Sequence, residues 1–159
     1  MDSMWHKWKA GGKKVTKEFY LELIGKLDLL ITNEIEELDK LNALASKITQ
    51  ENDGMPHAPG TSDKVGNISV KIVMKKQEIN DLIDLFIDLR EEIKGQIRKL
   101  HKDEYDVLYK YYVLGMGIFN IADARNKSES WVKTIKKEGL KNIEINFTNT
   151  LKKILKLLT

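Results

Sequence analysis

The chain has 159 residues, of which 32% are charged, and its formal net charge is +3 at pH 7. This length suits one domain, or one small domain with a helical appendage. Cysteine is absent, which excludes disulfides, thiol nucleophiles and zinc–thiolate sites. No apolar run approaches the ~18 residues that a membrane span needs, and the N-terminus lacks a secretory signal pattern. We therefore expect a cytoplasmic protein with no membrane partner.

Charge is distributed unevenly along the chain. Residues 15–53 carry 4 Lys/Arg against 9 Asp/Glu, whereas residues 125–159 carry 9 Lys/Arg against 3 Asp/Glu. An acidic segment avoids polyanions and a basic segment attracts them. This asymmetry favours a polyanionic partner for the C-terminal part of the chain.

Residues 1–14 precede the first periodic segment. The motif "GGKK" can be encoded by a purine-rich stretch that resembles a ribosome-binding site, and the valine that follows can arise from a start codon. We expect residues 1–14 to be a disordered arm or an upstream extension. The alternative is a basic, tryptophan-bearing arm that touches nucleic acid.

Residues 15–100 are expected to form two long helices joined by a loop at 50–63. Apolar residues recur at spacings of three and four through both segments, which predicts one apolar stripe on each helix. Lys75 and Gln96 interrupt the stripe of the second helix. The loop holds both prolines of the chain and has no periodicity. Two such helices predict an antiparallel hairpin, a dimerising coiled coil, or both, so we expect a homo-oligomer, with a dimer favoured.

Residues 101–144 are expected to form three short helices with tight connections, the arrangement of a helix-turn-helix unit. Ala122 is small enough for two helices to cross closely. Asn126 tolerates the left-handed conformation that the turn requires, and Ser128 can cap the helix that follows. The expected fold class is all-α, with a long two-helix hairpin followed by this C-terminal helix-turn-helix domain.

The outward side of the second helix in this unit is the candidate DNA-binding surface. Serine, threonine and lysine side chains suit base edges and phosphates, and a helix N-terminus adds unpaired N–H groups for a phosphate. The two basic residues that flank the turn stand where apolar residues normally pack, so either they point outward to phosphates or the turn is built differently. The candidate residues are Arg125, Lys127, Ser128, Ser130, Trp131, Lys133, Thr134 and Lys137. The alternative is a three-helix packing module with a solvated, lysine-rich face.

The segment "YYVLGMGIFNIADARNKSESWVKTIKKEGLKNI" resembles region 4 of sigma-70 factors, in which an aromatic-Val-x-Gly segment precedes an Ile-Ala helix, a Ser-capped turn and a Val-containing recognition helix. The long helical half, with its loop "MPHAPGTSDKVGN", resembles phage regulators of the ArpU and RinA type. The resemblance covers roughly residues 16–143. Gly139 stands where the family commonly has Ala, a departure that could shorten or bend the recognition helix, and Arg125 replaces an apolar residue.

This resemblance implies an activator of phage late genes that binds promoter-proximal double-stranded DNA in a bacterial host cell. By the sigma-like analogy it also implies a contact with RNA polymerase. Two rival functions remain open. One is a DNA-packaging subunit similar to a small terminase, and the other is a protein-binding module that acts on host RNA polymerase without DNA.

Residues 145–159 are expected to form an amphipathic C-terminal helix that folds back onto the domain or pairs in a dimer, with a membrane-surface helix as the alternative. The three histidines, His6, His57 and His101, are scattered without ligand spacing, and the chain has no glycine-rich phosphate loop. We therefore expect neither an enzyme nor a metal site, and no cofactor.

Overall fold

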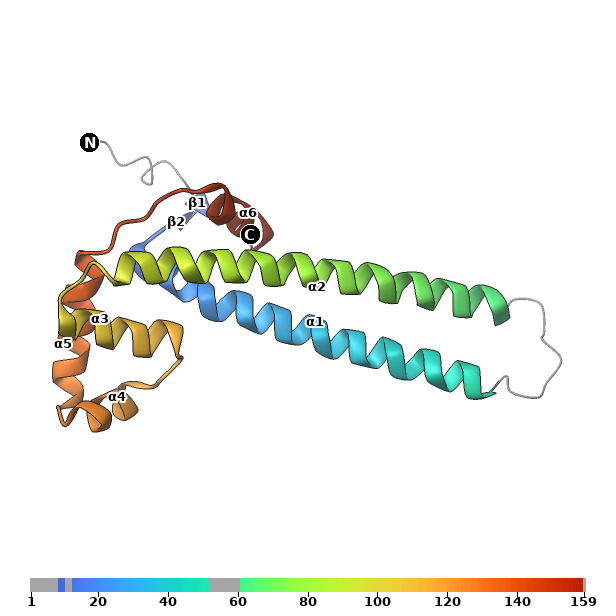
Figure 1. Cartoon of the computed structure of the whole chain (residues 1–159), viewed down its shortest axis with the longest axis horizontal. Helices are drawn as coiled ribbons and strands as arrows, with labels where there is room; N and C mark the ends of the chain where they lie inside the picture. Colours follow the sequence, from blue (N-terminus) through green and yellow to red (C-terminus); the bar gives the residue numbers. More distant parts are fainter. Residues whose placement is uncertain (1–8, 11–12, 52–60, 159) are drawn as a thin grey trace. The chain divides into compact units, whose positions relative to one another are not determined.

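The computed structural model describes residues 9–10, 13–51 and 61–158, and these residues are almost wholly helical, which confirms the all-α prediction (Figure 1). Two short strands, β1 and β2, pair antiparallel with Lys9 opposite Lys14. The elements in chain order are β1 (Lys9–Ala10), β2 (Lys13–Lys14), α1 (Lys17–Glu51), α2 (Thr61–Ile97), α3 (Lys102–Leu108), the π-helical turn η2 (Tyr109–Val113), α4 (Ile118–Arg125), α5 (Glu129–Lys141) and α6 (Asn149–Leu157).

Both segments that were expected to be irregular differ from the prediction where the structure describes them. The four described residues of the N-terminal arm form β1 and β2, whereas residues 1–8 and 11–12 lie outside the described residues. Helix α1 extends to Glu51 and α2 begins at Thr61, so both helices reach into the predicted loop at 50–63. The remainder of that loop, residues 52–60, is outside the described residues.

The chain divides into two compact units, and the division crosses both long helices. Residues 28–84 form the hairpin unit, and residues 1–27 with 85–159 form the basic unit. The hairpin unit carries 6 Lys/Arg against 11 Asp/Glu, a net charge of −5, and the basic unit carries 21 against 13, a net charge of +8. The predicted domains kept residues 15–100 together, whereas the ends of that segment belong with the short helices.

In the hairpin unit, α1 and α2 lie side by side in opposite directions (Figure 1). Apolar side chains such as Ile31, Ile79 and Leu82 fill the seam between them. Lys75, which interrupts the apolar stripe of α2, also occupies a seam position, and its ammonium lies 2.5 Å from the carboxylate of Glu34 on α1. The interruption is therefore a matched ion pair, and polar pairs at seam positions are known to fix the register of paired helices.

The basic unit has its own core, to which the first turns of α1, the last turns of α2, and α3 to α6 contribute. Gln96, the second interruption of the stripe, is buried there with 8% of its surface exposed. Helix α6 buries Leu151, Ile154 and Leu155, and the Thr148 hydroxyl before it donates to Glu92 of α2 at 3.0 Å. This is the fold-back arrangement expected for the tail. The fully buried large side chains of this unit are Tyr20, Leu21, Leu23, Leu27, Leu89, Ile93, Ile97, Leu108, Ile121, Ile143, Leu151 and Ile154.

None of the helices in the described ranges contains a stretch that is both long enough and apolar enough to cross a bilayer.

Candidate nucleic-acid interface

The connection between α4 and α5 is a tight, fully bonded turn. Asn126 adopts the left-handed conformation, with φ 52° and ψ 44°. Its N–H donates to Asp123 O at 3.2 Å, and the N–H of Lys127 donates to Ala122 O at 3.0 Å. These two bonds form a Schellman motif, which satisfies the last carbonyl groups of a helix and reverses the chain. The prediction that Asn126 provides the left-handed residue is confirmed.

Helix α5 begins with the predicted cap. Ser128 has an extended backbone, and its Oγ accepts a hydrogen bond from the N–H of Trp131 at 3.1 Å. Glu129 follows in the first helical turn, where a carboxylate interacts favourably with the helix dipole. Two consecutive local devices, the Schellman motif and the serine cap, therefore fix how α5 leaves α4.

A small apolar core holds α3, α4 and α5 together. Ala122 lies in it with 5% of its surface exposed, so it provides the close helix contact expected from its size. The inner side of α5 also contributes to this core, since Val132 is fully buried and Ile135 is half-buried. The buried members of this core are Val107, Ile121, Ala122 and Val132, and the half-buried ones are Tyr111, Met116, Ile118, Trp131 and Ile135.

Gly139 lies where α5 packs tightly against α3. A Cβ at this position would lie 2.9 Å from Leu108 Cδ1, 3.2 Å from Leu108 Cγ and 3.3 Å from Glu104 Cβ. Helix α5 continues without a break to Lys141. The glycine therefore neither ends nor interrupts the helix, as its departure from the family pattern could have suggested, and instead it makes room for α3.

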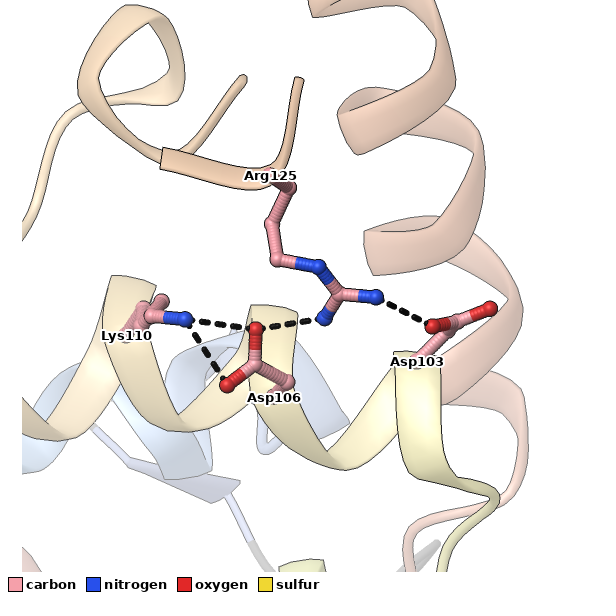
Figure 2. A network of polar contacts seen from close by, with 4 residues as sticks. All are labelled: Asp103, Asp106, Lys110 and Arg125. Carbon is pink, nitrogen blue, oxygen red and sulfur yellow. Dashed lines mark hydrogen bonds and ion pairs between the residues drawn. The ribbon is translucent and has the colours of Figure 1, made fainter. Parts of the chain in front are cut away.

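Arg125 is turned inward, onto α3 (Figure 2). Its Nη1 donates to Asp106 Oδ2 at 2.6 Å, and its Nη2 donates to Asp103 Oδ1 at 2.5 Å. Lys110 donates to both oxygens of Asp106, at 2.9 and 2.7 Å. The turn is thus built differently from the apolar pattern, because an ion-pair network replaces the apolar contact. With its guanidinium engaged by two carboxylates, Arg125 does not point outward to a phosphate, and we leave it out of the candidate interface.

The network controls the ionisation of Asp106. Partial burial raises the pKa of this carboxyl, but hydrogen bonds from Lys110 and Arg125 outweigh burial and bring the pKa below its ordinary value. Asp106 is therefore a carboxylate at neutral pH. Its ion pair with Arg125 of α4 is therefore present at neutral pH.

Two further contacts attach α5 to the first turn of α1. The Lys136 ammonium lies 3.8 Å from Glu18 and 4.0 Å from the centre of the Tyr111 ring. The Lys17 ammonium donates to the carbonyl oxygen of Lys141 at 2.7 Å, which satisfies one free carbonyl at the end of α5. Lys136 therefore belongs to the inner side of α5.

The opposite side of α5 carries exposed side chains that form a continuous stripe. None of the lysines in this stripe has an ion-pair partner among the residues that the structure describes. An ammonium without a carboxylate partner is available to a phosphate or a base edge. We call this surface the outer stripe, and it consists of Ser130, Lys133, Thr134, Lys137 and Lys141.

The remaining candidate residues surround the start of α5. Lys127 is exposed, and its ammonium lies 5.4 Å from the centre of the Trp131 ring. Trp131 is half-buried and packs on the core. Ser128 is exposed, and although its oxygen caps the helix, its O–H remains able to donate. The structure therefore places Lys127 and Ser128 at the N-terminus of α5, the end at which the outer stripe begins with Ser130.

Sequence reasoning missed the partners that hold this surface in place. The pairing of Asp106 with Lys110 follows the four-residue spacing of a helix and could have been found. The pairing of Arg125 with Asp103 and Asp106 has no local signal. In the described residues, no group of three or more His, Asp or Glu side chains could hold a metal ion.

No family model matches the chain, and neither a curated protein nor a solved structure gives a match. Its function is therefore inferred from its own residues and their geometry.

Proposed function

We propose that the chain is a sequence-specific DNA-binding regulator of transcription, with α5 as the recognition helix in the major groove. The observation that carries this proposal is the outer stripe. It presents three lysines, a serine and a threonine on one helix side, all exposed, while the other side of α5 packs into the core. Exposed lysine and hydroxyl side chains on a capped second helix are suited to phosphates and base edges.

The charge of the two units supports the same function. The basic unit, at +8, holds α5, whereas the hairpin unit has a net charge of −5. A polyanion attracts the basic unit and repels the hairpin unit. We therefore assign DNA binding to the basic unit and self-association to the hairpin unit.

Large apolar side chains remain exposed on the outer side of α2, and a second copy of the chain could cover them. They are Val70, Val73 and Met74, exposed by 57%, 66% and 66%.

The resemblance to sigma-70 region 4 and to phage late-gene regulators makes a late-gene activator in the cytoplasm of a bacterial host the specific form of this proposal, with RNA polymerase as a second partner. Light scattering distinguishes the proposed dimer from the large closed ring of a packaging subunit. A dimer would place two α5 helices about one helical turn of DNA apart, or a multiple of that distance.

The decisive experiment is selection of bound fragments from the source genome, followed by titration of the best fragment across salt. We expect one fragment to bind at least ~1,000-fold more tightly than bulk DNA. Lys127→Gln and Lys137→Gln should each weaken binding to all DNA sequences, because each removes one phosphate contact. The negative slope of log K against log salt should become shallower by about 0.9 per protomer in each variant.

The matched controls are Lys40→Gln and Lys47→Gln, which make the same chemical change at exposed positions of the hairpin unit. These variants should leave affinity and salt slope unchanged. The absence of any DNA binding at low salt, or equal losses in all four variants, would refute the proposal. In the first case the protein-binding alternative takes its place.

A further inference from the structure

The composition of the outer stripe restricts which bases it can read. At about 100° per residue, its five side chains fall within an arc of roughly 100° on the helix. No member is a carboxylate or an amide. Asparagine and glutamine are the side chains that make paired contacts to adenine, and glutamate and aspartate accept from cytosine. The stripe therefore lacks both the amides that make paired contacts to adenine and the carboxylates that accept from cytosine, while Glu129 and Glu138 lie at its two edges.

Thr134 has its hydroxyl proton already engaged. Its Oγ1 donates to the carbonyl oxygen of Ser130, one turn earlier on the same helix, at 2.9 Å. A threonine hydroxyl carries one proton only. Thr134 is consequently unable to donate to an acceptor on a base while this bond persists. What it can present to the groove is its methyl group, with the lone pairs of the hydroxyl oxygen.

Lys133 offers the opposite chemistry. Its side chain is exposed, and no hydrogen bond or ion pair engages it within the described part of the chain. An ammonium has three donors and no acceptor, and guanine presents two acceptors, O6 and N7, in the major groove. Lys133 lies in the second turn of α5, near the end that meets base edges in helix-turn-helix proteins. Lys137 lies one turn further along, where backbone phosphate is the natural contact.

We infer that each half-site contains a guanine bound by Lys133 and, at a neighbouring base pair, a thymine whose C5-methyl group packs against the methyl of Thr134. This inference rests on the proposed DNA-binding function and names the bases that the same surface selects. Thymine is the only base with a methyl group in the major groove, so a methyl–methyl contact distinguishes it from the other three.

The test is selection from a randomised duplex library with the full-length protein, followed by affinity measurements on the selected site and on single-base changes. Replacing the guanine should weaken binding by the wild-type protein about tenfold or more. Replacing the thymine by uracil, which removes only the methyl group, should weaken it about fourfold.

Two pairs of variants separate the groups that carry the recognition. Thr134→Val keeps a methyl at this position and removes the hydroxyl, so the preference for thymine over uracil should persist. Thr134→Ser keeps the hydroxyl and removes the methyl, so this preference should disappear. Lys133→Arg should retain the preference for guanine, whereas Lys133→Met should lose it. Circular dichroism establishes that the four variants fold equally.

The outcomes separate this inference from the function on which it rests. If the wild-type protein enriches no sequence, the proposed sequence-specific function fails and the inference fails with it. If it enriches a site whose preferences do not respond to changes at Lys133 and Thr134, the function stands and the inference is overturned. A thymine preference that survives in Thr134→Ser and is lost in Thr134→Val would show that the hydroxyl reads the base, which also overturns it.

Discussion

Gly139 allows the close packing of α5 on α3 to be tested by adding a single methyl group. In Gly139→Ala the new Cβ would lie 2.9 Å from Leu108 Cδ1, which is closer than van der Waals contact permits. Leu108 is fully buried and has little room to move away, and the Cβ of Glu104 lies 3.3 Å from the same point. The substitution therefore forces a displacement in the interface that positions α5.

Two effects of opposite sign determine the result. Alanine stabilises a helix interior by about 1 kcal/mol relative to glycine. Overpacking a tight interface costs about 1–3 kcal/mol. Because contacts of 2.9, 3.2 and 3.3 Å occur together and involve a fully buried leucine, we place the cost in the upper half of that range. The net expectation for Gly139→Ala is a loss of about 1–2 kcal/mol in the free energy of unfolding.

Gly25 provides the matched control. It also lies within a helix of the basic unit, but it is exposed and a Cβ there would have no atom within 4 Å. Gly25→Ala should therefore stabilise the protein by about 0.5–1 kcal/mol. Urea unfolding followed by circular dichroism measures both changes. If Gly139→Ala stabilises the protein as much as Gly25→Ala does, the interface can yield and the close-packing argument is wrong.

Four further predictions concern polar contacts. Arg125→Met should lower the free energy of unfolding by about 1–2 kcal/mol, because it leaves a partly buried carboxylate with one cation fewer. The pKa of Asp106 is lowered in the folded state, so the ionised carboxylate stabilises the fold above about pH 4 and this stabilisation is lost as the pH falls through the lowered pKa. In Asp106→Asn the free energy of unfolding should therefore decrease less as the pH falls, which unfolding measured at a series of pH values would show. Ser128→Ala should cost about 1 kcal/mol in thermal or urea unfolding through loss of the cap. Lys75→Met should lower Tm, because it leaves the Glu34 carboxylate without its partner in the seam, whereas the double variant Glu34→Leu with Lys75→Leu should not lower Tm. Equal losses of Tm in the two variants would mean that the ion pair stabilises the hairpin unit more than an apolar pair does.

The sequence predicted those features whose causes are local. The left-handed turn at Asn126 and the cap at Ser128 follow from side-chain chemistry within a few residues, and both are present. The apolar stripes of the long helices follow from periodicity. The unit boundary was missed, because the ends of α1 and α2 join the short helices through contacts far apart in the chain, such as Lys17 with Lys141.

The inward position of Arg125 illustrates why the rest could not be predicted. A basic residue beside a turn in a basic segment has the composition of a phosphate contact. Its two partners lie 19 and 22 positions earlier in the chain, and only the crossing of α4 over α3 brings them within reach. Gly139 is a similar case, because a local interpretation treats glycine as a weak point in a helix, and the neighbour that explains it is Leu108 on another helix.

These inward residues change how the charge of the C-terminal part relates to DNA binding. Residues 125–159 carry a net charge of +6, but Arg125 and Lys136 face carboxylates and aromatic rings inside the unit. A count of basic residues therefore overstates the number of cations that can meet phosphate. The exposed cations at the start and along the outer side of α5 are the ones on which our proposal depends, and we expect each to contribute separately to the salt dependence of binding. Part of the basic charge thus holds α5 in place, and the exposed part lies on the surface that we propose meets DNA.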